Sequence, residues 1–195
     1  MSCSQISTDI LNNCDNYLIA GTDDTMILLP YDDIDRTLST LDVTNKHLLT
    51  NLVMKSTKKG YKVEGRYFSN DADYALVKTK YSNDWDHNIM FRIFDISPAT
   101  KEWIAQLGSG RVVALLKTKT TAINAPHQYE VYGWDLGLEL GEMTRNQSDA
   151  ETKGANVLKL VCDETNKEPK QPLTFFKTDV PTTEAAVAAL ITVTP

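Results

Sequence analysis

The stretch Thr25-Met26-Ile27-Leu28-Leu29 decides the fold class of this chain. It is a short apolar run that follows Asp23 and Asp24 and stops at Pro30, which has no backbone N–H to donate to a sheet. An apolar run bounded in this way is typical of a buried β-strand. We therefore expect a sheet and look for its other strands on either side.

The next two strand-like segments predict a hairpin. Residues 48–55 and 61–66 flank the sequence Thr57-Lys58-Lys59-Gly60. Glycine adopts a positive φ without steric cost, which tight connections between strands often need. We expect Gly60 to have this role, and the lysines around it to form a solvated tip.

Two later segments indicate a sheet with one face in water. Residues 74–80 alternate between apolar and polar side chains, and in residues 87–95 Ile89, Phe91 and Ile93 share one face. Side chains in a strand point alternately to opposite faces, so this alternation predicts one buried and one solvated face.

The later part of the chain adds three more predicted strands. Residues 111–117 are rich in leucine and β-branched residues, residues 128–140 alternate around Tyr129 to Tyr132, and residues 155–161 form a late strand. Gly133, Gly137 and Gly141 interrupt or follow the second of these. Glycines inside a strand pattern predict bulges or sharp bends in a curved sheet.

A first helix is predicted to start at Ser97-Pro98, because the serine oxygen can accept a backbone N–H and proline is tolerated at the first helical position. Trp103, Ile104 and Leu107 then fall on one face, and we expect Gly108 to end the helix as a left-handed cap. A second, alanine-rich helix is predicted over residues 182–191, with a threonine cap and Glu184 in its first turn.

These elements together predict a β-rich α+β fold. We expect a β-sandwich or barrel with two short flanking helices, formed as a single domain over residues 1–195. The chain length is within the usual range of one domain. Its 42% apolar and 24% charged residues are ordinary values for a globular protein and unlike those of a disordered chain.

The charge and the cysteines limit the classes of function. A net charge of -6 argues against a surface that reads nucleic-acid sequence, because such binding needs clustered Lys and Arg. Cys3, Cys14 and Cys162 have neither a disulfide-framework nor a zinc-site spacing, so we expect reduced thiols. The start of the chain resembles no signal peptide, and no apolar run approaches the length of a membrane span. We therefore expect a cytosol-like compartment and no membrane partner.

No constellation of catalytic residues emerges from the sequence. His47, His87 and His127 lie in unrelated segments, where we expect surface or loop positions. There is no GxSxG motif, and the sequence Gly108-Ser109-Gly110 follows a helix instead of opening one, unlike a phosphate loop. The sequence thus predicts no enzyme activity, no catalytic residue and no cofactor.

Several pairs of aspartates offer oxygen atoms of the kind that bind calcium. Asp84, Asp86 and Asn88 form the best such group. None of the pairs continues into a calcium-binding loop, and Asp and Asn more often cap turns between strands. We therefore assign no metal-binding residue.

The aromatic side chains also allow two interpretations. A stacking platform for sugars or bases is one interpretation, and core or interface anchors are the other and commoner one. The residues concerned are Trp85, Trp103, Trp134, Tyr129 and Tyr132. Because they are scattered over different predicted elements, the second interpretation is favoured.

Several stretches of the chain resemble virion proteins of bacteriophages and prophages of gut Bacteroidetes, a group similar to tail-tube and head-to-tail connector ring proteins. The resemblance spans most of the chain. Its stretches are Asn13-Cys14-Asp15-Asn16 with Gly21 and Ile34-Asp35-Arg36; Lys58-Lys59-Gly60-Tyr61-Lys62 with Glu64-Gly65; Tyr129-Glu130-Val131-Tyr132-Gly133-Trp134-Asp135 with Gly137-Leu138; Glu142-Met143-Thr144-Arg145; Lys167-Glu168-Pro169; and Phe175-Phe176-Lys177-Thr178-Asp179.

The resemblance implies a tail-tube-like β-sandwich or barrel, repeated around a closed homo-oligomeric ring that can stack. It implies a virion location after synthesis in the host cytoplasm, contacts with other virion proteins, and a central channel for double-stranded DNA. It brings no catalytic residues. An acidic lumen would keep DNA from adhering to it. The helix residue Trp103 and the long loop 69–88 are the expected subunit contacts.

Two other interpretations remain open. One is a different virion component, a capsid accessory or head-fibre protein, which would more often be a monomer or trimer than a ring. The other is a calcium- or carbohydrate-binding β-sandwich module, an interpretation that a signal peptide would have favoured.

Overall fold

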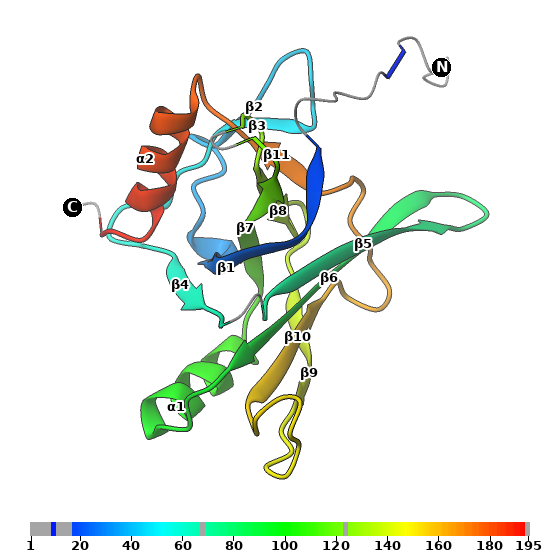
Figure 1. Cartoon of the computed structure of the whole chain (residues 1–195). Coiled ribbons are helices and arrows are strands. Elements are labelled where there is room, and N and C mark those ends of the chain that lie inside the picture. Colours follow the sequence, from blue (N-terminus) through cyan, green and yellow to red (C-terminus); the bar gives the residue numbers. More distant parts are fainter. Residues whose placement is uncertain (1–8, 11–16, 67–68, 123–124, 194–195) are drawn as a thin grey trace.

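The computed structural model describes residues 9–10, 17–66, 69–122 and 125–193 and confirms the predicted β-rich α+β fold (Figure 1). It contains a seven-stranded and a four-stranded sheet with two helices, and the described strands form no closed barrel. The strand order is β2-β3-β11-β8-β7-β1-β4 in the first sheet and β5-β6-β10-β9 in the second.

The elements of the seven-stranded sheet are β1 (Leu18–Pro30), β2 (Thr40–Leu41), β3 (Leu48–Asn51), β4 (Tyr61–Glu64), β7 (Val112–Thr120), β8 (Tyr129–Tyr132) and β11 (Leu173–Phe175). Those of the four-stranded sheet are β5 (Asp71–Lys78), β6 (Asn83–Ile93), β9 (Glu139–Thr144) and β10 (Asn156–Val161). The helices are α1 (Pro98–Leu107), α2 (Val180–Leu190) and a single 3₁₀ turn, Tyr31–Asp33.

The predicted strand at residues 25–29 lies inside the seven-stranded sheet, between β7 and β4. Met26, Ile27, Leu28 and Leu29 are all buried, although strand neighbours point to opposite faces. Both faces of the sheet at β1 must therefore be covered. The strand starts earlier than predicted because β1 continues through two register irregularities, between Leu18 and Thr22 and between Thr22 and Met26.

Two hydrophobic cores cover these two faces. Met26 and Leu28 lie in the core between the sheets, with Phe91 of β6, Leu158 of β10 and Ile104 of α1. The opposite face of β1 belongs to a second core. Its members include Ile27, Leu29, Val113 and Leu115 of the sheet and Val187 and Leu190 of α2. The molecule is thus layered, with α2, the seven-stranded sheet and the four-stranded sheet in that order, and α1 contributing to the inter-sheet core (Figure 1).

The predicted hairpin over residues 48–66 is wrong. β3 pairs with β2 and β11, whereas β4 pairs with β1 at the far edge of the sheet. Positive φ occurs at Thr57 (66°) instead of Gly60. Gly60 meets a different constraint: its N–H donates to the Leu190 carbonyl at 2.7 Å, and a Cβ there would lie 2.4 Å from Leu29 Cδ2.

The predicted strand over residues 128–140 divides between the two sheets. β8 belongs to the first sheet and β9 to the second. Between them Gly133 and Gly137 have positive φ, and the Gly137 N–H donates to the Gly133 carbonyl at 3.1 Å. The predicted bulge at Gly141 is confirmed, because the β9–β10 register passes from Glu142 opposite Lys159 to Leu140 opposite Leu160.

Both helices occur where they were predicted, with different caps. The side chain of Ser97 accepts the Thr100 N–H at 3.2 Å, as expected for α1. Gly108 has a right-handed φ of -69°, so the left-handed cap is wrong. α2 starts two residues before the predicted position because Asp179, and not a threonine, caps it and accepts the Thr182 N–H at 2.7 Å.

We expect Gly60→Ala to lower the free energy of unfolding by about 1 to 3 kcal/mol, because the new methyl group overpacks the buried Leu29 and Ile27 side chains. Gly110→Ala is the matched control, since nothing lies within 4 Å of a Cβ at that position. Urea unfolding of both variants measures the effect, and equal stability of the two would contradict this account of Gly60.

Candidate assembly surface

The four-stranded sheet has one covered and one open face. Side chains of β6 alternate: Ile89 and Phe91 point into the inter-sheet core, and Asp84 and Asn88 point the other way. α1 contributes to the inter-sheet core, and α2 packs on the far side of the other sheet. Within the described part of the chain, neither a helix nor a second sheet covers this outer face.

Acidic side chains dominate the outer face. The strand register places the following residues on it: Asp71, Asp73, Asp84, Asp86, Glu139 and Glu142 as acids, and Arg92 and Lys159 as bases. Asp86 is neutralised by an ion pair at the margin of this face, because Lys167 Nζ lies 2.9 Å from Asp86 Oδ1. The remaining excess of negative charge gives the face a field that repels polyanions.

The two edge strands of this sheet, β5 and β9, are solvent-exposed along most of their length. Apolar side chains lie on both: Tyr74 is 42%, Leu76 43% and Met143 44% exposed. An exposed strand edge presents unpaired N–H and C=O groups that can pair with another chain. Among the described strands, none pairs with the outer edge of either.

The predicted loop 69–88 is instead the arm of a long hairpin. β5 pairs with β6 from Asn83 to Met90, whereas β10 pairs with β6 only from Asn88 to Ile93. Beyond the antiparallel bridge between Trp85 and Glu168, the hairpin is a two-stranded ribbon, which Figure 1 shows extending from the body of the molecule. Tyr81 in its turn is 88% exposed.

Buried Glu168 anchors the base of this ribbon. Its backbone exchanges two hydrogen bonds with Trp85 of β6, at 2.7 and 3.0 Å. Its carboxylate accepts the backbone N–H groups of Asp135 at 2.9 Å and Leu136 at 2.8 Å, in the turn between β8 and β9. Burial raises the pKa of the Glu168 carboxyl, against the effect of these two hydrogen bonds. One residue thus ties the hairpin to the connection between the two sheets.

His87 lies beside this anchor and is only 1% exposed, so the predicted surface or loop position is wrong for it. The Gly133 N–H donates to Nδ1 at 3.2 Å, and Nε2 lies 3.0 Å from the Lys170 carbonyl. A carbonyl oxygen only accepts, so Nε2 carries the proton and the ring is neutral. Burial lowers the pKa of His87 to about 4. His47 and His127 are exposed, as predicted.

Cys162 is near His87 without forming a nucleophile and base. Its Sγ accepts the backbone N–H of His87 at 3.3 Å, not a ring proton. Burial raises the pKa of the Cys162 thiol, whereas a nucleophilic cysteine needs a lowered one. The free thiol predicted for Cys162 is confirmed; Cys3, Cys14 and the stretch 13–16 lie outside the described residues.

The residues considered for calcium each interact within the protein. Asp84 accepts from the Ser82 hydroxyl at 2.5 Å, Asp86 pairs with Lys167, and the Asn88 amide donates to Asp73 at 3.0 Å. No group of three His, Cys, Asp or Glu within the described ranges is arranged to hold a metal ion.

The aromatic residues do not form one platform. Tyr74 contacts Trp85 and Tyr132 at centroid distances of 5.8 and 6.5 Å, inside the junction of the sheets. Trp134 is 7% exposed, and the Arg36 guanidinium lies 4.0 Å from the centroid of its ring. These side chains serve as core anchors, as the favoured interpretation expected.

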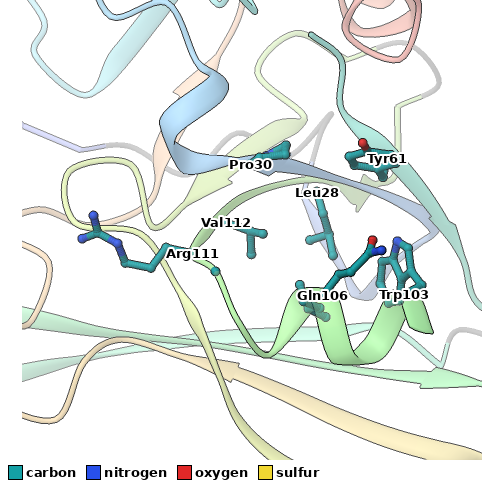
Figure 2. Close-up of a pocket in the computed structure, with 9 residues that line it drawn as sticks. Leu28, Pro30, Tyr61, Trp103, Gln106, Arg111 and Val112 are labelled. Carbon is teal, nitrogen blue, oxygen red and sulfur yellow. The ribbon is translucent and has the colours of Figure 1, made fainter. Parts of the chain in front are cut away.

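Trp103 lies where the helix prediction placed it, half-buried against the inter-sheet core. It also lines a cavity of about 220 Å³ between α1 and the strands β1, β4 and β7. Figure 2 shows Trp103 and Gln106 pointing from α1 toward Leu28 and Tyr61. Nothing in this cavity combines a nucleophile with a base.

Comparison of the chain with protein-family models, with curated proteins and with solved structures found no match. In the part of the chain that the structure describes, no helix has both the length and the apolar character that a membrane crossing requires.

We expect Glu168→Ala to destabilise the protein by about 3 kcal/mol, because two partly buried N–H groups lose their acceptor. Hydrogen exchange should accelerate most at Asp135 and Leu136. Glu164→Ala, at an exposed position in the same connection, is the control. Unchanged protection of the two amides in the Glu168 variant would show that the carboxylate is not their partner.

His87 should make stability depend on pH between its ordinary pKa of 6.5 and its folded value of about 4. The unfolded chain takes up a proton first as the pH falls, so the free energy of unfolding decreases by up to about 3 kcal/mol through this window. The raised pKa of Glu168 acts in the opposite direction and reduces the slope. His87→Gln, which can keep both hydrogen bonds, should remove most of the dependence, and His47→Gln should not.

Proposed function

We propose that the protein is a non-enzymatic structural subunit of a bacteriophage virion, a tail-tube or head-tail connector ring protein. It assembles with copies of itself into a closed ring that can stack, and it is made in the cytoplasm of the bacterial host. The observation that carries the proposal is the open, acidic face of the four-stranded sheet, bounded by two exposed strand edges. The resemblance of the sequence to such proteins favours it.

The open face suits the wall of a channel for double-stranded DNA. Its carboxylates repel phosphates, so the duplex is kept from adhering and passes without sequence preference. This repulsion acts over roughly 10 Å at ordinary salt concentration, a distance that a hydrated channel provides. The layered architecture places α2 on the other side of the subunit, facing away from the proposed lumen.

The exposed edges suit a subunit that is completed by its neighbours. Monomeric proteins usually shorten, charge or cover their edge strands, because an open edge promotes association. Here both edges of the sheet are long and uncovered in the described part of the chain, and they carry exposed apolar side chains beside their acids. Contacts with other virion proteins would use the outer surfaces that the ring leaves accessible.

Native mass spectrometry and electron microscopy over a range of concentrations test the assembly. We expect a single closed oligomer, stacks of it at high concentration, and the protein as a component of purified phage particles. A strictly monomeric protein that is absent from particles would overturn the proposal.

The channel is tested with assembled rings and a DNA-binding assay at several salt concentrations. Wild-type rings should bind duplex DNA weakly, whereas Asp84→Lys/Asn88→Lys rings should bind it in a salt-dependent manner because the lumen becomes positive. The same change of charge on α2, Thr182→Lys/Glu184→Lys, is the control for a surface outside the lumen. Equal DNA binding by the two double variants would contradict the assignment of the lumen face.

A further inference from the structure

The strand directions in the four-stranded sheet allow one edge to join the other edge of a second copy. β5, β6, β10 and β9 alternate in direction, because every neighbouring pair is antiparallel. The first and last strands therefore run in opposite directions. When a rotation about an axis along the strands brings β9 of one copy beside β5 of the next, the new pair is antiparallel as well, and the alternation continues across the boundary.

The side chains on the inner side of these two edges match. Tyr74 and Leu76 point inward on β5, since they pair with His87 and Trp85. On β9 the inward side chains are Leu140 and Met143, which pair with the buried Leu160 and Leu158. The bulge at Gly141 explains why these two are three residues apart. Each edge thus offers two apolar side chains on the same side of the sheet.

We propose that β5 of one copy pairs with β9 of a second copy, with Leu76 opposite Leu140 and Tyr74 opposite Met143. This pairing rests on the proposed ring and specifies its subunit contact. On the outer side it places Val77 opposite Glu139, Ala75 opposite Glu142 and Asp73 opposite Thr144, so no acid faces another acid. Directly opposite side chains lie about 5 Å apart and contribute most to strand pairing.

Neighbouring registers are worse by the same criteria. A shift of two residues in one direction places Asp73 opposite Glu142, and like charges in direct opposition are destabilising. The same shift in the other direction places Lys78 opposite Leu140 and leaves Tyr74 opposite Arg145. A shift of one residue would turn the apolar row to the outer face. The first register is favoured because, of these, it alone combines two apolar pairs on the inner side with no acid opposite another acid.

The contact uses two different edges, so each copy binds one neighbour through β5 and another through β9. Such a heterologous contact closes into a ring or continues as a filament, and it does not stop at a dimer. Pairing of β5 with β5 of a second copy would be symmetric and would stop at two copies. This difference makes the choice of edges measurable.

Cysteine cross-linking tests the register directly. In a Cys3→Ser/Cys14→Ser background, Asp73→Cys and Thr144→Cys are combined in one chain, and the assembled protein is treated with an oxidant or a short bis-maleimide. We expect a ladder of covalent oligomers on a denaturing gel, whereas each variant with only one of the two introduced cysteines should stay monomeric, because the remaining Cys162 is buried. Dimers from Asp73→Cys alone, or no ladder from assembled rings of the double variant, would overturn the pairing.

An exchange of charges between the two edge strands tests the same contact without cross-linking. Ala75→Glu, which places an acid opposite Glu142 at an exposed position of each edge, should raise the concentration required for assembly at least tenfold, and adding Glu142→Lys in the combined variant should recover most of this loss. Tyr81→Lys, at the exposed turn, is the control, and melting of each monomer shows that the fold is kept. Absence of recovery in the combined variant would count against the register.

The outcomes separate this inference from the proposed function. Rings found in phage particles without the cross-linked ladder would leave the virion role standing and overturn the β5–β9 contact. A ladder formed by a protein that is absent from particles would support the contact and overturn the virion role.

Discussion

Burial of β1 on both of its faces is the constraint on which the rest of the structure depends. Four successive apolar residues, Met26 to Leu29, are removed from water together, and alternate ones point to opposite sides of the sheet. A sheet with two apolar faces needs two covering layers. The four-stranded sheet with α1 covers one face and α2 covers the other. The open acidic face exists because, among the described residues, no further layer lies outside the covering sheet.

The sequence predicted the elements of this fold better than their connections. Local signals were sufficient for the run at residues 25–29, for α1 with its Ser97 cap, and for the bulge at Gly141. The pairing of distant segments could not be predicted, because no local sequence signal distinguishes a hairpin from two strands in separate parts of one sheet. Gly60 illustrates this limit: its sequence context suggested a turn, whereas tertiary contact with Leu29 and Leu190 determines its role.

The candidate surface was predictable only in part. Alternation in residues 87–95 indicated a sheet with one wet face, but the acids that gather there come from strands far apart in the sequence. The buried anchor was missed altogether, since glutamate usually lies at the surface and histidine is intermediate in its burial. The one available signal was the position of His87 in the same alternating row as Ile89 and Phe91. Their burial depends on partners from the β8–β9 turn, which a linear pattern does not reveal.

The pairing of β1 also has a consequence for synthesis on the ribosome. Leu28 pairs with Ala114 in β7 and with Tyr61 in β4, so its two neighbours are made long after it. Until β7 emerges, the apolar run has at most one partner strand. Folding that waits for such distant contacts is slow, and the waiting segment is exposed to association with other chains. Expression at lower temperature or with holdase chaperones should therefore favour soluble protein.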